Sequence, residues 1–486
     1  MNLVDALRQS NMKTENGMTT NSTSLNACVD LFYTIGAARR MDEEELNQLF
    51  LSAFLENSDL AMKILFWARD IRGGAGERRA FRTIIKDVAK GSPKALVHNL
   101  KYVPEFGRWD DLLEMIDTPL ERDALVLIAD ALTAKNQLCA KWMPRKGYSA
   151  AKVRDFMGLT HKEYRKMLVN ATNVVETKMC SNLWEDIEFS KVPSLAMTRY
   201  GNAFNRNSNE AFNQFKDDLK NGDTTVNAGA IYPYDIIKSL PTVYRTSAFN
   251  TEFDDAVAQA QWDSLENYME GSDKKILPVV DTSGSMDVSV SGSTTALDVA
   301  VSLGMYISER NEGAFKDAFI TFSEHPELQY VPNGTLLEKV SSLKSANWGM
   351  NTNLQATFEL ILETAKKNNI SADEMPDTLL ILSDMQFDRC TGTGRGINRS
   401  ESDWNPTVFE MIELMYAQAD YKMPNIVFWN LRASNGVPVS FDKNGTALIS
   451  GFSPSIMKHV LGSEEFNPEA IMLETISSDR YTIIES

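Results

Sequence analysis

Two short aliphatic runs in the second half of the chain each lead into an aspartate, and they constrain the fold more than any other feature. The first is Ile276–Asp281, and the second runs over residues 378–383, directly before Asp384. Unbroken apolar runs of this length are typical of strands that are buried on both faces, as in parallel sheets. Open α/β sheets bind ligands outside the carboxyl ends of their strands, so we expect both aspartates at a ligand site.

The sequence around these runs alternates between strand and helix patterns. This alternation predicts a Rossmann-like, doubly wound parallel sheet over residues 271–486. The expected strands and helices, besides the two runs above, are the strands 318–322 and 425–431 and the helices 295–310, 354–365 and 406–419.

The first 270 residues have helical periodicity almost throughout. Residues 42–57 carry the apolar stripe of a helix, and Phe81, Ile84 and Val88 share one side of another. Thr160 begins a capping-box pattern before a further helix. Helices joined by short loops predict a solenoid of HEAT type over residues 1–270. The expected fold class is therefore α plus α/β, with a helical domain followed by a sheet domain.

The first aspartate begins a D-x-S-x-S sequence formed by Asp281, Ser283 and Ser285. Thr352 precedes a predicted helix, and Asp384 follows the second aliphatic run. Hydroxyl and carboxylate oxygens are hard ligands, suited to Mg²⁺ or Mn²⁺. Turns rich in Asp, Ser and Gly are common, so the prediction of a metal site depends on the strand context and on the two later residues.

These five residues, in this order, resemble the metal-ion-dependent adhesion site of von Willebrand factor type A domains. The resemblance implies that Ser283 and Ser285 bind the cation through their hydroxyls and that Thr352 completes the ligand set. It implies that Asp281 and Asp384 support the site by hydrogen bonding. The open coordination position would then accept a carboxylate or phosphate from a partner.

The chain has a net charge of -17, but the charge is unevenly placed. Residues 61–100 contain nine basic and three acidic residues, and residues 61–220 have a local net charge of +7. Such a region is either a set of solvated helix faces or an electrostatic footprint for phosphate. The candidates for RNA contact are Arg69, Arg72, Arg78, Arg79, Arg82, Lys86, Lys141, Arg145, Lys146, Lys162, Arg165 and Lys166.

Several of these candidates also have a purely structural interpretation. Arg69 and Arg72 are placed to cap helix ends or to pair with Asp70 and Glu77. The glycine-rich segment 73–76 is a simple turn as readily as a phosphate cradle.

The combination of a helical region with a type A domain resembles the Ro autoantigen (TROVE-module) family, in particular a branch found in bacteria and phages. The segments that carry the resemblance are residues 69–78, 103–112, 191–194 and 227–229. It implies a HEAT-repeat ring that binds the ends of misfolded RNAs inside and stem-loop RNAs on a basic outer face. A Ro-like role would be RNA quality control or scaffolding of an RNA–protein complex.

Composition excludes several other classes of protein. The sequence lacks an apolar run of eighteen residues and a signal-peptide pattern, so we expect no membrane partner. Four scattered cysteines favour a reducing, cytoplasmic location, and none of the four histidines lies in a catalytic motif.

We therefore expect a Ro-like RNA-binding protein that is not an enzyme. The alternative is a scaffold whose metal recruits a carboxylate of a protein partner, without RNA. Metal-assisted phosphoryl chemistry ranks last, because no general base or second metal cluster accompanies the site.

Overall fold

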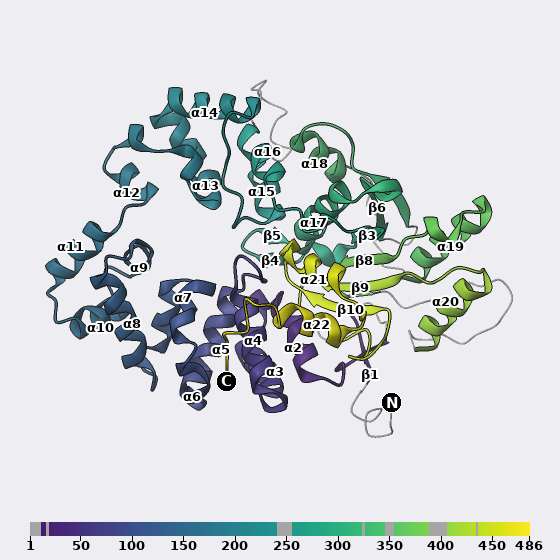
Figure 1. Cartoon of the computed structure of the whole chain (residues 1–486), viewed down its shortest axis with the longest axis horizontal. Coiled ribbons are helices and arrows are strands. Elements are labelled where there is room, and N and C mark those ends of the chain that lie inside the picture. Colours follow the sequence, from purple (N-terminus) through teal and green to yellow (C-terminus); the bar gives the residue numbers. More distant parts are fainter. Residues whose placement is uncertain are drawn as a thin grey trace. The chain divides into compact units, whose positions relative to one another are not determined.

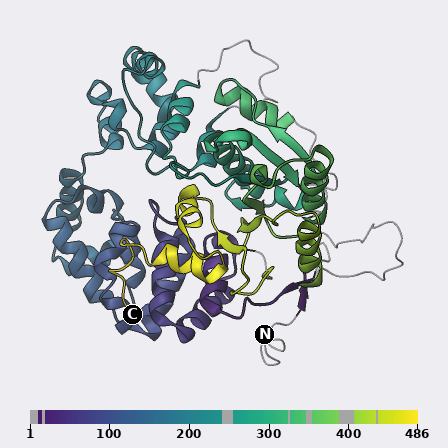
Figure 2. The same cartoon turned by 45° about the vertical axis from the view of Figure 1, so that its right-hand side comes forward.

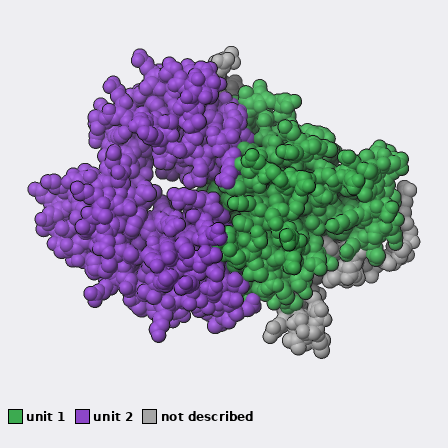
Figure 3. Space-filling model, in the orientation of Figure 1, with its two compact units in different colours: residues 1–41, 232–251, 267–478 green, residues 42–231, 252–266, 479–486 purple. Residues whose placement is uncertain are grey.

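The computed structural model describes residues 11–15, 19–240, 255–322, 326–345, 354–387, 406–433 and 436–486. Its contacts divide the chain into two compact units (Figure 3). The sheet unit contains residues 1–41, 232–251 and 267–478, and the helical unit contains residues 42–231, 252–266 and 479–486.

A six-stranded sheet forms the core of the sheet unit, in the order β10-β9-β8-β3-β6-β7. The first five strands in this order run parallel, and β7 pairs antiparallel with β6 at one edge. The predicted parallel sheet is thus a mixed sheet, with an antiparallel edge at β7, a mostly exposed four-residue strand that the sequence reasoning did not assign. The strands are β3 (Ile276–Asp281), β6 (Ala318–Phe322), β7 (Glu327–Tyr330), β8 (Thr378–Ser383), β9 (Asn425–Asn430) and β10 (Thr446–Ser450).

Helices pack on this sheet (Figure 1). Every residue of the inner strands β3 and β8 is buried, and so is every residue of the edge strand β10. Helix α17 (Ala296–Arg310) contacts β3, β6 and β8, and begins with a capping box formed by Thr295 and Asp298. The other helices are α2 (Ala27–Ile35), η1 (Ala38–Arg40), α15 (Pro233–Ser239), η7 (Gly284–Asp287), η8 (Gly313–Phe315), α18 (Leu336–Ser345), α19 (Leu354–Asn368), η9 (Ala372–Glu374), α20 (Pro406–Gln418), η10 (Pro454–Ile456), α21 (Met457–Gly462) and α22 (Pro468–Ile476).

The N-terminal residues belong to the sheet unit, although the sequence predicts one helical domain over residues 1–270. Residues 11–21 contain the antiparallel strands β1 (Asn11–Lys13) and β2 (Thr19–Asn21). Helix α2 follows and contacts β9 and β10. This helix is apolar on nearly all sides, so it requires burial, and the sheet supplies it. A second small antiparallel pair, β4 (Ser289–Ser291) and β5 (Thr294–Thr295), precedes α17.

The helical unit has the α-helical character that the sequence predicts. Residues 42–231 contain no strand in their described structure, which covers them all. The helices are α3 (Glu43–Glu56), α4 (Ser58–Arg69), α5 (Arg78–Gly91), α6 (Pro93–Val97), η2 (Leu100–Tyr102), α7 (Val103–Phe106), η3 (Trp109–Met115), α8 (Glu121–Thr133), α9 (Gln137–Trp142), α10 (Tyr148–Phe156), α11 (His161–Ala171), α12 (Val175–Cys180), η4 (Trp184–Asp186), η5 (Phe189–Lys191), α13 (Ser194–Asn207), α14 (Asn209–Asn221) and α16 (Ala256–Asp263).

Neighbouring helices of this unit pack mainly on elements close in sequence, as Figures 1 and 2 show for the helices from α3 to α11. The predicted capping box at Thr160 and Glu163 is confirmed at the start of α11. Helices α12 to α14 and α16 enclose a separate apolar core that includes Phe189, Phe204 and Phe212. The chain is thus a helical region followed by a mixed α/β region, the α plus α/β class expected from the sequence.

Candidate metal centre

The carboxyl edge of the sheet brings together the two aspartates that the sequence singles out. Asp281 is the last residue of β3, and Asp384 directly follows β8. The two strands are parallel neighbours, with Val280 paired to Leu382. Both aspartate side chains are completely buried. Parallel pairing therefore places two carboxylates that are 103 positions apart in the chain at one edge, as expected from the sequence.

The two serines of the motif link these carboxylates through hydrogen bonds. The Ser283 amide donates to Asp281 Oδ1 at 2.9 Å. The hydroxyls of Ser283 and Ser285 lie 2.9 Å apart, and Ser285 Oγ donates to Asp384 Oδ1 at 3.3 Å. Four of the five predicted metal-site residues are thus joined by hydrogen bonds, through the Ser283 amide and the two serine hydroxyls. The fifth, Thr352, lies outside the described residues.

Burial disfavours the ionised forms of the two aspartates in this cluster. Burial, and then the charge of Asp384, raise the pKa of Asp281 to about 7, against the hydrogen bonds from Ser383 and Ser283. Burial also raises the pKa of Asp384, although the Gln386 amide and Arg432 act in the opposite direction. Two buried carboxylates that resist ionisation are a favourable setting for a cation, because its charge would offset their desolvation.

The donor set fits a small hard cation. No group of three or more His, Cys, Asp or Glu side chains suited to metal binding occurs among the described residues. A cation at this edge would therefore depend on the Ser283 and Ser285 hydroxyls together with the two aspartates. Oxygen-only sites of this kind favour Mg²⁺ or Mn²⁺ over the softer metals that cysteine and histidine select.

Ser383 also belongs to this hydrogen-bonded cluster, and the sequence reasoning missed it. Its hydroxyl donates to Asp281 Oδ2 and accepts from the Met385 amide at 2.9 Å. Met385 has a left-handed backbone, with φ of 63°, and this turn directs Asp384 into the cluster. A serine directly before the strand-ending aspartate was the available signal.

Arg432 is the second residue that sequence reasoning missed. It follows β9, the strand next to β8, and its Nη1 lies 3.3 Å from Asp384 Oδ2. The residue stands alone, 48 positions beyond Asp384, in no recognisable motif. Only the order of the strands brings it to the same edge of the sheet.

Two of the predicted RNA-binding arginines are engaged inside the helical unit. Arg69 is buried, with Nη2 2.7 Å from Asp111 Oδ2. Arg82 Nε lies 2.6 Å from Asp111 Oδ1, and Nη2 lies 2.8 Å from Asp110 Oδ2. Sequence reasoning weighed Asp70 and Glu77 as partners for Arg69, whereas the partner is Asp111. With their guanidinium groups occupied in this way, Arg69 and Arg82 are poor candidates for phosphate contact.

The glycine-rich turn after α4 is filled by the protein itself. The Asp70 carboxylate accepts the backbone amides of Arg72 and Gly73 at 3.0 and 3.2 Å. It also accepts Arg480 Nη2 at 2.8 Å and the Tyr481 hydroxyl at 3.0 Å. A Cβ at Gly74 would lie 1.9 Å from the Trp67 carbonyl oxygen, so glycine is required for close packing. The structural interpretation of this turn is therefore better supported than a phosphate cradle.

The remaining candidates on and near α5 differ in exposure. Arg72 and Arg78 are exposed, and Arg72 Nη1 donates to the Glu105 carbonyl at 3.4 Å. Burial and the neighbouring Arg108 and Arg82 lower the pKa of Arg78. Arg79 forms a long ion pair with Glu43, at 3.7 Å.

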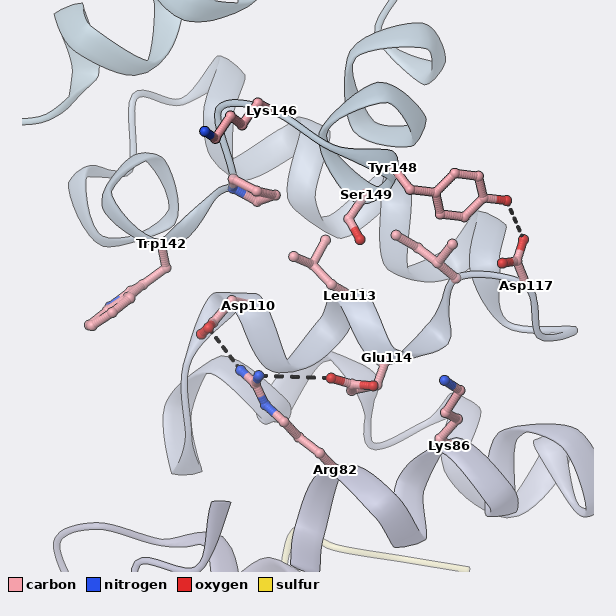
Figure 4. A pocket seen from close by; sticks show the side chains of 12 residues that line it. Arg82, Lys86, Asp110, Leu113, Glu114, Asp117, Trp142, Lys146, Tyr148 and Ser149 are labelled. Atoms are coloured by element: carbon pink, nitrogen blue, oxygen red, sulfur yellow. Dashed lines mark hydrogen bonds and ion pairs between the residues drawn. The ribbon is translucent and has the colours of Figure 1, made fainter. Parts of the chain in front are cut away.

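Lys86 and Lys146 are exposed and line a pocket of about 450 Å³ in the helical unit (Figure 4). Arg82 also lines it, and Figure 4 shows its guanidinium directed at Asp110 and Glu114. The pocket therefore mixes both signs of charge and is not a purely cationic surface.

A cluster of exposed cations lies further along the helical unit. Lys162, Arg165 and Lys166 follow one another at helical spacing on α11 and are all exposed, as is Arg145 before α10. Lys141, by contrast, pairs with Glu176 at 3.1 Å. Accessible positive charge is therefore present on α11 as well as at Arg78 and Lys86 of α5.

No helix among the described residues is long and apolar enough to cross a membrane.

Comparisons with known proteins give two family matches. A family described as a domain of unknown function, DUF2828, matches residues 14–137 and 125–274. A second such family, DUF7788, matches residues 275–482. The uncharacterised protein L728 of Acanthamoeba polyphaga mimivirus is 31% identical over 525 residues, which cover 95% of this chain and 86% of that protein.

Among solved structures, the crystal structure of the Deinococcus radiodurans Ro (RSR) protein aligns with 91% of this chain and 93% of its own. The sequence identity is 16% and the TM-score is 0.32.

Proposed function

The chain belongs to the DUF2828 family, and for this member we propose a divalent-cation-dependent binding protein that recognises an acidic group of a macromolecular partner. The observation that carries the proposal is the continuous hydrogen-bonded chain from Asp281 through Ser283 and Ser285 to Asp384. The cation would be Mg²⁺ or Mn²⁺. The protein would act by binding and not by catalysis.

The hydrogen bonds suggest that some residues of the cluster orient the site and that others bind the cation. Both oxygens of Asp281 already accept hydrogen bonds, from the Ser283 amide and from Ser383, so this carboxylate orients the site. The Ser283 and Ser285 hydroxyls are then the groups closest to a cation, with Thr352 as the further expected ligand. A cation bound by neutral hydroxyls and supported by carboxylates stays electrophilic, which favours an incoming carboxylate.

The strand order supports the assignment of a von Willebrand type A domain to the sheet unit. The D-x-S-x-S sequence follows the inner strand β3, and the second aspartate follows its parallel neighbour β8. This is the arrangement that the resemblance implies for an adhesion site.

Calorimetric titration with Mn²⁺ tests the proposal. Wild-type protein should bind one Mn²⁺, and Ser283→Ala with Ser285→Ala should abolish binding while leaving the circular dichroism spectrum unchanged. Asp287→Asn is the matched control, because Asp287 is an exposed carboxylate of the same turn. Binding that persists in the double-serine variant, or disappears in the control, would contradict the assignment.

A second candidate function is RNA binding by the helical unit, as a Ro-like protein would perform it. The observation that favours it is the exposed row Lys162, Arg165 and Lys166 on α11. The sequential packing of helices in this unit supports a HEAT-like array, in which such rows commonly line a binding surface.

Filter binding with single-stranded and stem-loop RNA at several salt concentrations tests the second function. Reversing the three charges of α11 to glutamate should weaken binding and flatten its salt dependence, because fewer counterions are released. The matched control reverses Lys366, Lys367 and Lys422, which are exposed in the sheet unit. Equal losses in the two variants would argue against an interface on α11.

A further inference from the structure

Arg432 is held rigidly beside the candidate cation site. The buried Asn430, the last residue of β9, accepts the amides of Arg432 and Ala433 at 3.1 and 3.0 Å. Its own amide donates to the Tyr33 carbonyl at 3.2 Å. Ala433 has a left-handed backbone, with φ of 56°. The backbone that carries this arginine is therefore fixed by the core of the sheet unit, which limits the positions that its guanidinium can reach.

The guanidinium of Arg432 joins the site to the N-terminal segment. Nη1 lies 3.3 Å from Asp384 Oδ2 and 3.2 Å from Glu15 Oε2. No hydrogen bond of Nε or Nη2 occurs within the described part of the chain. A guanidinium has five N–H donors, and a carboxylate can take two of them side by side. Arg432 thus retains donors for another acidic group.

Glu15 reaches Arg432 because the segment around it is tied to the sheet. Its amide donates to Gln386 Oε1 at 2.6 Å, and Thr14 Oγ donates to the Phe387 carbonyl at 2.8 Å. Asn21 pairs with Val437 further along the same segment. The Glu15 side chain is 61% exposed, so water and a competing carboxylate can both reach it.

A bound divalent cation would change which charges balance one another at this site. Two positive charges would offset Asp281 and Asp384. Arg432 would then be balanced by Glu15 alone. A carboxylate is the group that this chain itself places against Arg432, and this observation indicates the chemistry that fits there.

We propose that Arg432 is a specificity-determining residue that binds an acidic side chain of the partner beside the cation, and that Glu15 occupies this position until the partner binds. The partner is a peptide segment with closely spaced Asp or Glu residues, one reaching the cation and the next Arg432. This inference rests on the proposed cation-dependent function and names the partner of the same site.

The test measures two affinities for each variant of the full chain. Mn²⁺ binding is measured by calorimetry, and binding of a fluorescent hexapeptide of alternating Asp and Glu is measured by anisotropy with Mn²⁺ present. Arg432→Gln should weaken peptide binding on the order of tenfold, since a charge-assisted contact is lost. The same change should leave Mn²⁺ binding unchanged or about threefold tighter, since a neighbouring positive charge is removed.

Glu15→Gln should have the opposite effect on the peptide and strengthen its binding about threefold to tenfold, because an internal competitor is removed. Glu363→Gln, on the exposed side of α19, is the matched control and should change neither affinity. A purely structural arginine would instead lower both affinities together when it is replaced.

Peptide binding that is unchanged in Arg432→Gln, or weakened in Glu15→Gln, would overturn the inference. So would Mn²⁺ binding without peptide binding in both wild type and Glu15→Gln. Failure of the wild type to bind Mn²⁺ at all is a different result, and it would reject the proposed function on which the inference rests.

Discussion

Among the described residues, each unit contains two completely buried aspartates, and the two pairs have different partners. In the helical unit, Asp111 is held by the guanidinium groups of Arg69 and Arg82 at 2.6 to 2.8 Å. In the sheet unit, Asp281 is held by the Ser383 hydroxyl and the Ser283 amide, which are neutral. Asp111 therefore has cationic partners, whereas the described residues provide Asp281 with hydrogen bonds from neutral donors.

Asp70 and Asp384, the other buried aspartates of the two units, also differ in their partners. Asp70 accepts hydrogen bonds from Arg480 and from the Tyr481 hydroxyl. Asp384 accepts from the Ser285 hydroxyl and the Gln386 amide, and its contact with Arg432, at 3.3 Å, is longer and is shared with Glu15. A buried charge that is matched inside the protein stabilises one arrangement of the chain. The pair in the sheet unit is held mainly by neutral donors, and the proposed cation would supply positive charge there.

Breaking the matched pair should have the largest effect. Arg69→Met keeps the aliphatic stem but leaves Asp111 with one guanidinium fewer in a buried position. We expect a loss of about 3–5 kcal/mol in the free energy of unfolding, measured by urea denaturation.

The control for this prediction is Arg79→Met. Arg79 forms its ion pair with the exposed Glu43, and its loss should cost less than about 1 kcal/mol. Equal effects of the two substitutions would remove the distinction between the buried and the exposed pair.

The unmatched pair should make metal-free stability fall as pH rises. Asp281 has a folded pKa of about 7, above the value of about 4 of an unfolded aspartate. Its favourable contribution is therefore complete below about pH 4 and is lost as pH rises through about 7.

Asp281→Asn should abolish this loss of metal-free stability at rising pH, because asparagine does not ionise. In EDTA, the stability of wild type relative to Asp281→Asn should decrease by up to about 4 kcal/mol between pH 4 and pH 8. If thermal denaturation gave parallel pH profiles for the two proteins, the ionisation of Asp281 would not be the cause of the pH dependence of stability.

The smallest effect is expected from the residue that orients Asp281. Ser383→Ala removes the hydroxyl bonded to Asp281 Oδ2 without removing a predicted ligand. We expect Mn²⁺ affinity to fall about tenfold, as is usual for groups that position a metal ligand. Ser302→Ala is the control, because the buried Ser302 hydroxyl bonds to the carbonyl of Val299 within α17. An equal change in both would argue against an orienting role.

Much of the sheet and part of the site could be predicted from the sequence, because both depend on local patterns. The buried runs at β3 and β8 are apolar throughout, and each leads into its aspartate. The edge strand β7, of four residues, and the strand β10, of five, are too short for the sequence pattern alone to identify. The N-terminal strands β1 and β2, of three residues each, escaped prediction for the same reason.

The residues that were missed depend on long-range contacts. Arg432 joins the site only because β9 lies beside β8, and Glu15 only because the N-terminal segment pairs near the same edge. For the basic residues, long-range contacts had the opposite effect and removed candidates that the sequence suggested. Arg69 and Arg82 contribute to a positive count in sequence, but they pair with Asp110 and Asp111 in space, and no sequence window reveals that pairing.

A crystal of the wild-type protein grown with Mn²⁺ would show directly whether this edge of the sheet binds the cation. We expect one strong anomalous difference peak at the carboxyl edge of the sheet, within about 2.3 Å of the Ser283 and Ser285 hydroxyl oxygens. Asp281 should remain bonded to Ser383. A peak elsewhere in the molecule, or none at Mn²⁺ concentrations that saturate calorimetric binding, would contradict the assignment of this edge as the metal centre.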